Sequence, residues 1–226
     1  MNTKESSMNF DCVVFDFNGT LFFDDDKHVA AWNQISKEIR GIGITPQELH
    51  ENINGVPNQQ TITFLSGGTY TQEQIDFYSQ KKEAVYREKC MEDTEKFHLV
   101  DGAEEYFDYL KSKNIPFTIA TASIKPNVDF FIESFHLDRW IPRDHFVYDD
   151  GTYENKVAMF QDACRILGSD PDHCLVFEDS GSGIRNAYEA GCSNIIIMAG
   201  QKDFAEFEGK PGVQKIIRSF REMLSE

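Results

Sequence analysis

Five short runs of β-branched and aromatic residues, separated by helical patterns, constrain the fold of this chain more than any other feature. The runs lie at residues 12–17, 117–121, 145–148, 174–179 and 194–199. They are nearly continuous in apolar residues, which is typical of strands buried on both faces. Such strands, when they alternate with amphipathic helices, form a parallel sheet covered on both sides. The sequence therefore predicts a doubly wound α/β core.

Helical patterns lie between and after these runs. Residues 157–167 and 182–191 carry apolar residues at helical spacing, and each segment is closed by a glycine, Gly168 and Gly191. Glycine is common just past a helix end. Residues 213–224 show a similar stripe, from which we expect a last helix. The stripe consists of Val213, Ile216, Ile217, Phe220 and Leu224.

Residues 24–98 break the alternation, because they contain helical patterns and no convincing strand. Two capping boxes mark helix starts in this region, one from Thr45 to Glu48 and one from Thr71 to Gln74. We therefore expect a Rossmann-like core made of residues 1–23 and 99–226. A helical domain of residues 24–98 is inserted after its first strand.

The composition fits one large domain or one domain with an insert. Of 226 residues, 40% are hydrophobic and 27% are charged, as in soluble globular proteins. The formal net charge is -16, from 38 acidic and 22 basic side chains, which argues against nucleic acid and anionic membranes as partners. This charge also repels anionic substrates. A phosphate site would need local positive charge, from a metal ion and one or two lysines.

The cysteines and the N-terminal residues indicate the compartment. The cysteines are odd in number and form no CxxC pair, so we expect reduced thiols that mostly pack as small hydrophobic side chains. They are Cys12, Cys90, Cys164, Cys174 and Cys192. The first ten residues are polar and have no signal-peptide core. No apolar run approaches the ~18 residues of a membrane span. We expect a soluble, cytoplasmic protein.

Polar side chains end three of the predicted strands. Asp16 ends the first, Thr121 the second, and Glu178 with Asp179 the fourth. Ligands of open parallel sheets bind at this edge, beyond the carboxyl ends of the strands. A single acid there could simply face solvent, but three carboxylates at one edge repel each other unless a cation lies among them. Oxygen ligands of this kind suit Mg²⁺, which also binds phosphate oxygens.

Four segments, in this order, resemble the motifs of the haloacid dehalogenase superfamily of phosphohydrolases. They are DFNGT at residues 16–20, TIATAS at residues 118–123, Lys156 in YENKVAMF, and VFEDSGSGIRNAYEAG at residues 176–191. The resemblance spans nearly the whole chain. The helical insert is similar to a cap of that superfamily's first type, as in β-phosphoglucomutase-like members, and such caps close over the strand ends and exclude water.

The resemblance implies roles for the acidic residues. Asp16 would be the nucleophile that attacks phosphorus and forms an aspartyl-phosphate. Asp16, Glu178, Asp179 and the main-chain carbonyl of Asn18 would hold Mg²⁺.

The resemblance also implies a phosphate site. Thr121 would donate a hydrogen bond to the transferring phosphoryl group, and Lys156 would neutralise its charge. Gly19 would allow the backbone to approach phosphate closely, and its neighbour Thr20 belongs to the same site, as does Ala122. Lys156 could also be an ordinary solvated lysine at a helix start.

Asn18 departs from the superfamily's pattern, in which phosphatases and phosphomutases usually carry a second aspartate that acts as acid and base. An amide cannot do this, and losing general acid–base help typically slows a reaction by ~10²–10⁴-fold. Three explanations stay open. His28 could supply the proton, unless it is simply a polar residue at a helix start. The substrate could have a good leaving group, such as an acyl phosphate. The protein could bind phosphorylated ligands without turning them over.

Two residues of the insert bear on specificity. Lys82 interrupts the apolar face of a helix expected over residues 72–92. It resembles a substrate-contacting lysine of β-phosphoglucomutases, or it could be a stem whose ammonium reaches solvent at the edge. Asn58 stands where phosphoglucomutases place an arginine for the second phosphate of the substrate, so bisphosphate recognition would be weakened.

The sequence therefore favours an Mg²⁺-dependent phosphohydrolase that acts on a small phosphorylated metabolite, such as a sugar phosphate. The alternatives are a β-phosphoglucomutase-like mutase and a phosphoryl-ligand-binding protein with weak turnover. Dehalogenases and phosphonate-cleaving relatives are minor alternatives. Dehalogenases need no metal, whereas this chain keeps the acidic pair Glu178 and Asp179. Phosphonate-cleaving enzymes need a Schiff-base lysine, and none can be assigned in the insert.

Overall fold

The computed structural model describes residues 10–224 and divides into two compact units. The first, which we call the α/β unit, combines Met1–Phe23 with His98–Glu226. The second, the helical unit, is Asp24–Phe97. The described residues include no helix of the length and apolarity that a bilayer crossing requires.

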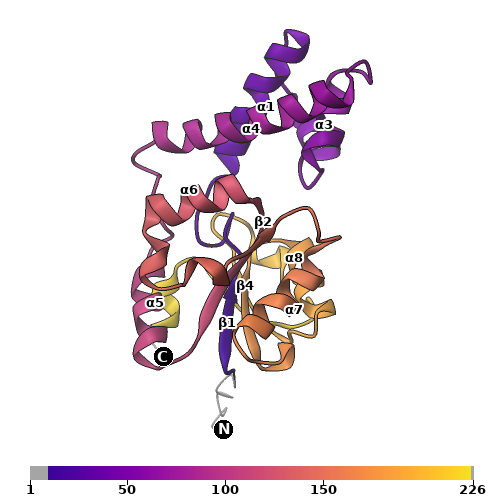
Figure 1. The fold of residues 1–226 in the computed structure, drawn as a ribbon. Helices are drawn as coiled ribbons and strands as arrows, with labels where there is room; N and C mark the ends of the chain where they lie inside the picture. Colours follow the sequence, from indigo (N-terminus) through magenta and orange to yellow (C-terminus); the bar gives the residue numbers. More distant parts are fainter. Residues whose placement is uncertain (1–9, 225–226) are drawn as a thin grey trace. The chain divides into compact units, whose positions relative to one another are not determined.

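The α/β unit is built on one six-stranded sheet in which every pair of neighbouring strands is parallel. The strands are β1 (Cys12–Phe15), β2 (Phe117–Ile124), β3 (Val147–Asp149), β4 (Cys174–Glu178), β5 (Asn194–Met198) and β6 (Val213–Ile217). Their order is β3-β2-β1-β4-β5-β6, so the direction of winding reverses between β1 and β4 (Figure 1). This confirms the predicted doubly wound fold and places a ligand-binding switch point beside β1.

Helices cover both faces of this sheet, α5 on one side and α7 and α8 on the other (Figure 1). The helices of the unit are α5 (Ala103–Ser112), α6 (Lys125–Phe135), α7 (Lys156–Ile166) and α8 (Gly181–Glu189). Short turns of helix lie at η2 (Leu137–Arg139), η3 (Arg143–His145), η4 (Pro171–His173), η5 (Phe204–Glu206) and η6 (Phe220–Met223). The helices predicted before Gly168 and Gly191 are confirmed as α7 and α8.

The side chains of β1 alternate between the two layers of the core. Phe15 stacks on Phe177 of β4 with ring centroids 4.9 Å apart and meets Phe107 of α5 edge to face at 5.2 Å. Val14 points to the opposite face and packs in a cluster with residues of α7 and α8, among them Phe160. Because β1 is buried on both faces along its whole length, the residue that follows it has a fixed position.

The helical unit contains helices and no strand over residues 24–97. Its elements are α1 (Asp25–Arg40), α2 (Pro46–Glu48), the π-helix η1 (Leu49–Ile53), α3 (Asn58–Leu65) and α4 (Gln72–Glu92). Both predicted capping boxes are present, at Thr45 before α2 and at Thr71 before α4. The long helices α1 and α4 pack against each other.

The prediction of one helix over residues 213–224 is wrong. Residues 213–217 form β6, which pairs with β5 at the edge of the sheet, and only Phe220–Met223 is helical. Val213, Ile216 and Ile217 are β-branched, which favours a strand, and a capping box at Ser219 starts the short helix. The apolar residues of the strand and of the short helix together had the spacing expected of one helix. The strand expected at residues 145–148 likewise begins only at Val147, since His145 ends η3.

We expect Phe15→Ala to lower the free energy of unfolding by about 3–5 kcal/mol, because it removes a fully buried ring between two layers. Urea denaturation followed by circular dichroism measures this. Phe23→Ala is the matched control, since Phe23 is 43% exposed and its loss should cost about 1 kcal/mol or less. Equal effects of the two substitutions would contradict the assignment of Phe15 to the core.

Candidate active site

Three carboxylates meet at the carboxyl edge of the sheet. Asp16 follows β1, Glu178 ends β4, and Asp179 comes next in the chain; β1 and β4 are direct neighbours. Oxygen atoms of the three side chains lie within 4.8 Å of one another, and all three residues are buried. The structure thus brings together the acids that the sequence placed at this edge.

Two lysines balance these acids. The Lys156 ammonium donates to Asp16 Oδ1 at 2.8 Å and to Glu178 Oε1 at 2.5 Å. The Lys202 ammonium donates to Asp179 Oδ2 at 2.5 Å and to the backbone oxygen of Asp179 at 2.9 Å. Lys156 begins α7 but its side chain is only 15% exposed, so the interpretation as a solvated lysine is wrong. Sequence reasoning missed Lys202, whose only signal was its position just past β5, next to β4 in the sheet.

Burial and crowding govern the ionisation of this group. Burial raises the pKa of Asp16 to about 8; the Lys156 ammonium opposes this shift, and the carboxylates of Glu178 and Asp179 add to it. Burial also raises the pKa of Asp179 to about 6, with Glu178 contributing in the same direction. Burial alone would lower the pKa of Lys156, but Asp16 and Glu178 raise it above its ordinary value. A further cation at this edge would favour the ionised acids.

Two glycines make room for the carboxylates. Gly19 has φ 76°, and a Cβ there would lie 2.3 Å from Asp179 Oδ2. Gly183 lies in α8, where a Cβ would lie 2.0 Å from Glu178 Oε2. Glu178 Oε2 also accepts hydrogen bonds from the Asp179 amide at 3.0 Å and the Ser180 hydroxyl at 3.2 Å. The start of α8 therefore holds Glu178 in place through close contact and hydrogen bonds.

Asn18 is held by hydroxyl groups from β2. Its Oδ1 accepts from Ser123 Oγ at 2.7 Å and from Thr121 Oγ1 at 3.3 Å. Thr121 thus directs its proton to Asn18 in this arrangement, and Ser123 is a site residue that sequence reasoning missed. Thr20 Oγ1 lies 3.5 Å from Asp16 Oδ2 as a weak donor, and Ala122 is an exposed residue of β2.

The other predicted residues form a cluster inside the helical unit. The Lys82 ammonium donates to His28 Nδ1 and to Glu83 Oε1, both at 2.9 Å, and Asn58 Nδ2 donates to the same Glu83 oxygen at 2.6 Å. Lys82 is only 3% exposed, so the interpretation as a stem reaching solvent is wrong. The His28 ring stacks on Tyr86 with centroids 4.1 Å apart. Sequence reasoning missed Glu83, the anion that makes burial of Lys82 tolerable.

The carboxylate edge fits a divalent cation. Its donors are oxygens, which Mg²⁺ prefers. Three ionised carboxylates and two ammonium groups leave one net negative charge, which would repel a phosphate dianion. A divalent ion would reverse the sign of this charge. Asp16, Glu178, Asp179 and the main-chain carbonyl of Asn18 could hold this divalent ion.

Fold and site together define a class of protein: an α/β protein with a cluster of buried acids and lysines at the switch point of a parallel sheet. A model of the haloacid dehalogenase-like hydrolase family matches residues 10–191. The chain belongs to this family, which confirms the predicted resemblance and hydrolase class.

Three known proteins illustrate the similarity. The structure of a HAD hydrolase of family IA, variant 3, from Entamoeba histolytica HM-1:IMSS is 36% identical, covers 94% of this chain and 95% of its own, and superposes with a TM-score of 0.87. A phosphorylated carbohydrates phosphatase of Thermotoga maritima is 25% identical over 187 residues, 82% of this chain and 83% of its own. A β-phosphoglucomutase of Clostridium difficile, 17% identical, shares the fold, with a TM-score of 0.72 over 95% of this chain and 93% of its own.

We expect Gly183→Ala to destabilise the protein by about 1–3 kcal/mol, because the new methyl group collides with the Glu178 carboxylate. Gly181→Ala, in the same helix, is the control. A Cβ there meets chiefly the flexible end of Lys210, so this change should be neutral or stabilise by up to about 1 kcal/mol. Thermal unfolding of both variants measures the difference. Equal stabilisation by both substitutions would show that the Glu178 carboxylate does not pack closely against Gly183.

Proposed function

We propose that this protein is an Mg²⁺-dependent phosphohydrolase that removes phosphate from a small phosphorylated metabolite. The observation that carries the proposal is the group of Asp16, Glu178 and Asp179 within 4.8 Å of one another, beside two lysines. A named phosphatase of phosphorylated carbohydrates among the relatives supports the substrate class.

Asp16 is the residue best placed to act as nucleophile. One of its carboxylate oxygens would form a bond to phosphorus while the bond from phosphorus to the leaving oxygen breaks, giving an aspartyl-phosphate. Water would then attack phosphorus and return the Asp16 carboxylate and inorganic phosphate. The ammonium of Lys156, 2.8 Å from Asp16 Oδ1, would neutralise charge on the transferring group. Bound Mg²⁺ would neutralise phosphate oxygens and hold the ionised Asp16 in position.

The leaving oxygen needs a proton that Asn18 cannot supply. We therefore propose that the best substrates have leaving groups of low basicity, such as acyl or aryl phosphates. His28 remains a predicted proton source, although its Nδ1 accepts from the Lys82 ammonium, which directs its Nε2 hydrogen toward Asp24 at 3.4 Å.

A phosphosugar mutase of the β-phosphoglucomutase type is the weaker alternative. A mutase must bind a bisphosphate, and the predicted position for that second phosphate, Asn58, donates its amide to Glu83. An asparagine engaged in this way offers no guanidinium fork for a second phosphate. Substrate contacts by Asn58, Lys82 and His28 stay predictions.

We expect the wild-type protein to release phosphate from acyl and aryl phosphates with Mg²⁺, and EDTA to abolish this release. Asp16→Asn should lose activity by at least ~10³-fold, since the nucleophile is removed. Asn18→Asp should accelerate release from sugar phosphates by about 10²-fold or more, because an acid becomes available to protonate the leaving oxygen. A phosphate-release assay over a panel of compounds measures all three.

Intact-mass measurement must first show that Asn18 has not deamidated, because Asn-Gly pairs are prone to this change. Activity of Asp16→Asn equal to that of the wild type would refute the assigned nucleophile. If wild type and Asn18→Asp are both silent, binding of aluminium fluoride with Mg²⁺ decides the matter. Tight binding that depends on Asp16 would support a phosphoryl-ligand-binding protein, and no binding would refute the site.

A further inference from the structure

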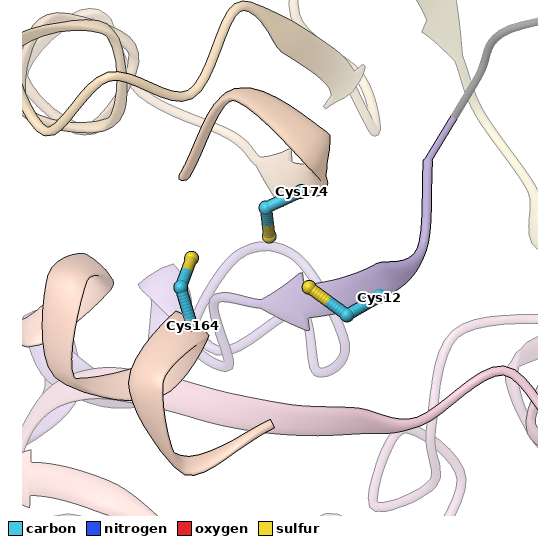
Figure 2. Close-up of side chains that lie close together, drawn as sticks. All are labelled: Cys12, Cys164 and Cys174. Carbon is cyan, nitrogen blue, oxygen red and sulfur yellow. The ribbon is translucent and has the colours of Figure 1, made fainter. Parts of the chain in front are cut away.

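A cluster of cysteine thiols lies at the opposite end of the sheet from the carboxylates. Cys12 is the first residue of β1 and Cys174 the first residue of β4, and the two are register partners on neighbouring strands. Cys164 comes from α7, which covers that face of the sheet. The three Sγ atoms lie within 4.8 Å of one another, and Figure 2 shows them pointing into a common space.

A fourth cysteine lies in the same part of the core. Cys192 follows α8, directly after Gly191. All four residues are 0% exposed and belong to the same core cluster. The prediction that the cysteines are buried is confirmed, but four of the five gather at one place, which their scattered positions in the sequence did not indicate.

We propose that Cys12, Cys164 and Cys174 form a binding site for one soft, thiophilic cation, Zn²⁺ or Cu⁺, with Cys192 of the same core cluster as the candidate for a fourth ligand. Thiolates select these metals, whereas carboxylate and carbonyl oxygens select Mg²⁺. Around a tetrahedral Zn²⁺ with bonds of ~2.3 Å, sulfurs are roughly 3.8 Å apart. The sulfurs of Cys12, Cys164 and Cys174, which lie within 4.8 Å of one another, therefore need to approach each other by about an ångström at most. On binding, each ligating S–H loses its proton to solvent, and the thiolate donates an electron pair to the cation.

A polar residue and exposed residues flank this site. The half-buried Ser169, just past α7, donates its hydroxyl to the Asp170 carbonyl at 3.4 Å and could steady a Cys12 thiolate as an outer partner. Asp11 and His173 directly precede Cys12 and Cys174 and are exposed, and the Asp11 amide donates to the His173 carbonyl at 2.9 Å. Both strand starts that carry these buried cysteines thus directly follow an exposed residue. Apolar residues such as Val14 and Ile195 surround the cluster and exclude water.

Metal titration of the reduced protein tests the proposal. The purified chain, kept anaerobic with a non-thiol reductant and excess Mg²⁺ to fill the carboxylate edge, would compete with a chromogenic chelator for Zn²⁺ or, in a separate arm, for Cu⁺. We expect one cation per chain in at least one arm. Cys164→Ala and Cys174→Ala should each weaken binding by roughly 100-fold or more. Cys90→Ala, which removes the buried thiol of the helical unit, should change it by less than about twofold.

Proton release in weakly buffered solution provides a readout that does not depend on variants. Binding to thiols should release about three protons per cation, which a pH indicator records, whereas binding to ionised carboxylates should release none. Cys164→Ser, which keeps a side chain of similar size, stands in for Cys164→Ala if that variant fails to fold. The proposal is overturned if the wild type does not compete with the chelator in either arm, if no protons are released, or if Cys90→Ala weakens binding as much as Cys164→Ala.

Discussion

The mutual repulsion of three buried carboxylates is the constraint on which the rest of this structure depends. Asp16, Glu178 and Asp179 share one small volume at the sheet edge, and ammonium groups from two separate segments neutralise much of their charge. Removing either lysine would leave a buried carboxylate without its ion-pair partner, which strongly lowers the stability of a folded protein. With all three acids ionised, one net negative charge would remain, which would favour a cation at this edge. The same group thus serves both the fold and the proposed chemistry.

Asn18 is the residue at which binding and turnover would separate under the proposed mechanism. It sits two residues after Asp16, the proposed nucleophile, and accepts hydrogen bonds from Thr121 and Ser123, so its position is fixed by β2. The groups proposed to bind phosphate lie around it, while the acid expected at that position is missing. The proposal therefore makes the leaving group of the substrate decisive. The family relationship gives the reaction class, and this one residue would decide which substrates react fast.

The two ends of β1 and β4 carry different kinds of side chain. Carboxylate oxygens lie at their carboxyl ends, and cysteine sulfurs lie at their amino ends, four residues earlier in the chain. Hard and soft cations would therefore be sorted to opposite ends of the same two strands. The helical unit adds a third charged group, in which Lys82, His28 and Glu83 are paired in its interior. Buried polar groups of this kind are tolerated only when each is satisfied.

The sequence by itself determined the doubly wound core, the helical insert and the acids of the edge, because the short apolar runs and the positions of Asp16, Glu178 and Asp179 are local properties of the chain. It misread residues 213–224, since the same apolar spacing suits a helix or a strand with a turn, and only pairing with β5 decided between them. Lys202, Ser123 and the cysteine cluster were also beyond its reach. Each depends on which distant segments the sheet order brings side by side, and nothing in a single sequence records that proximity.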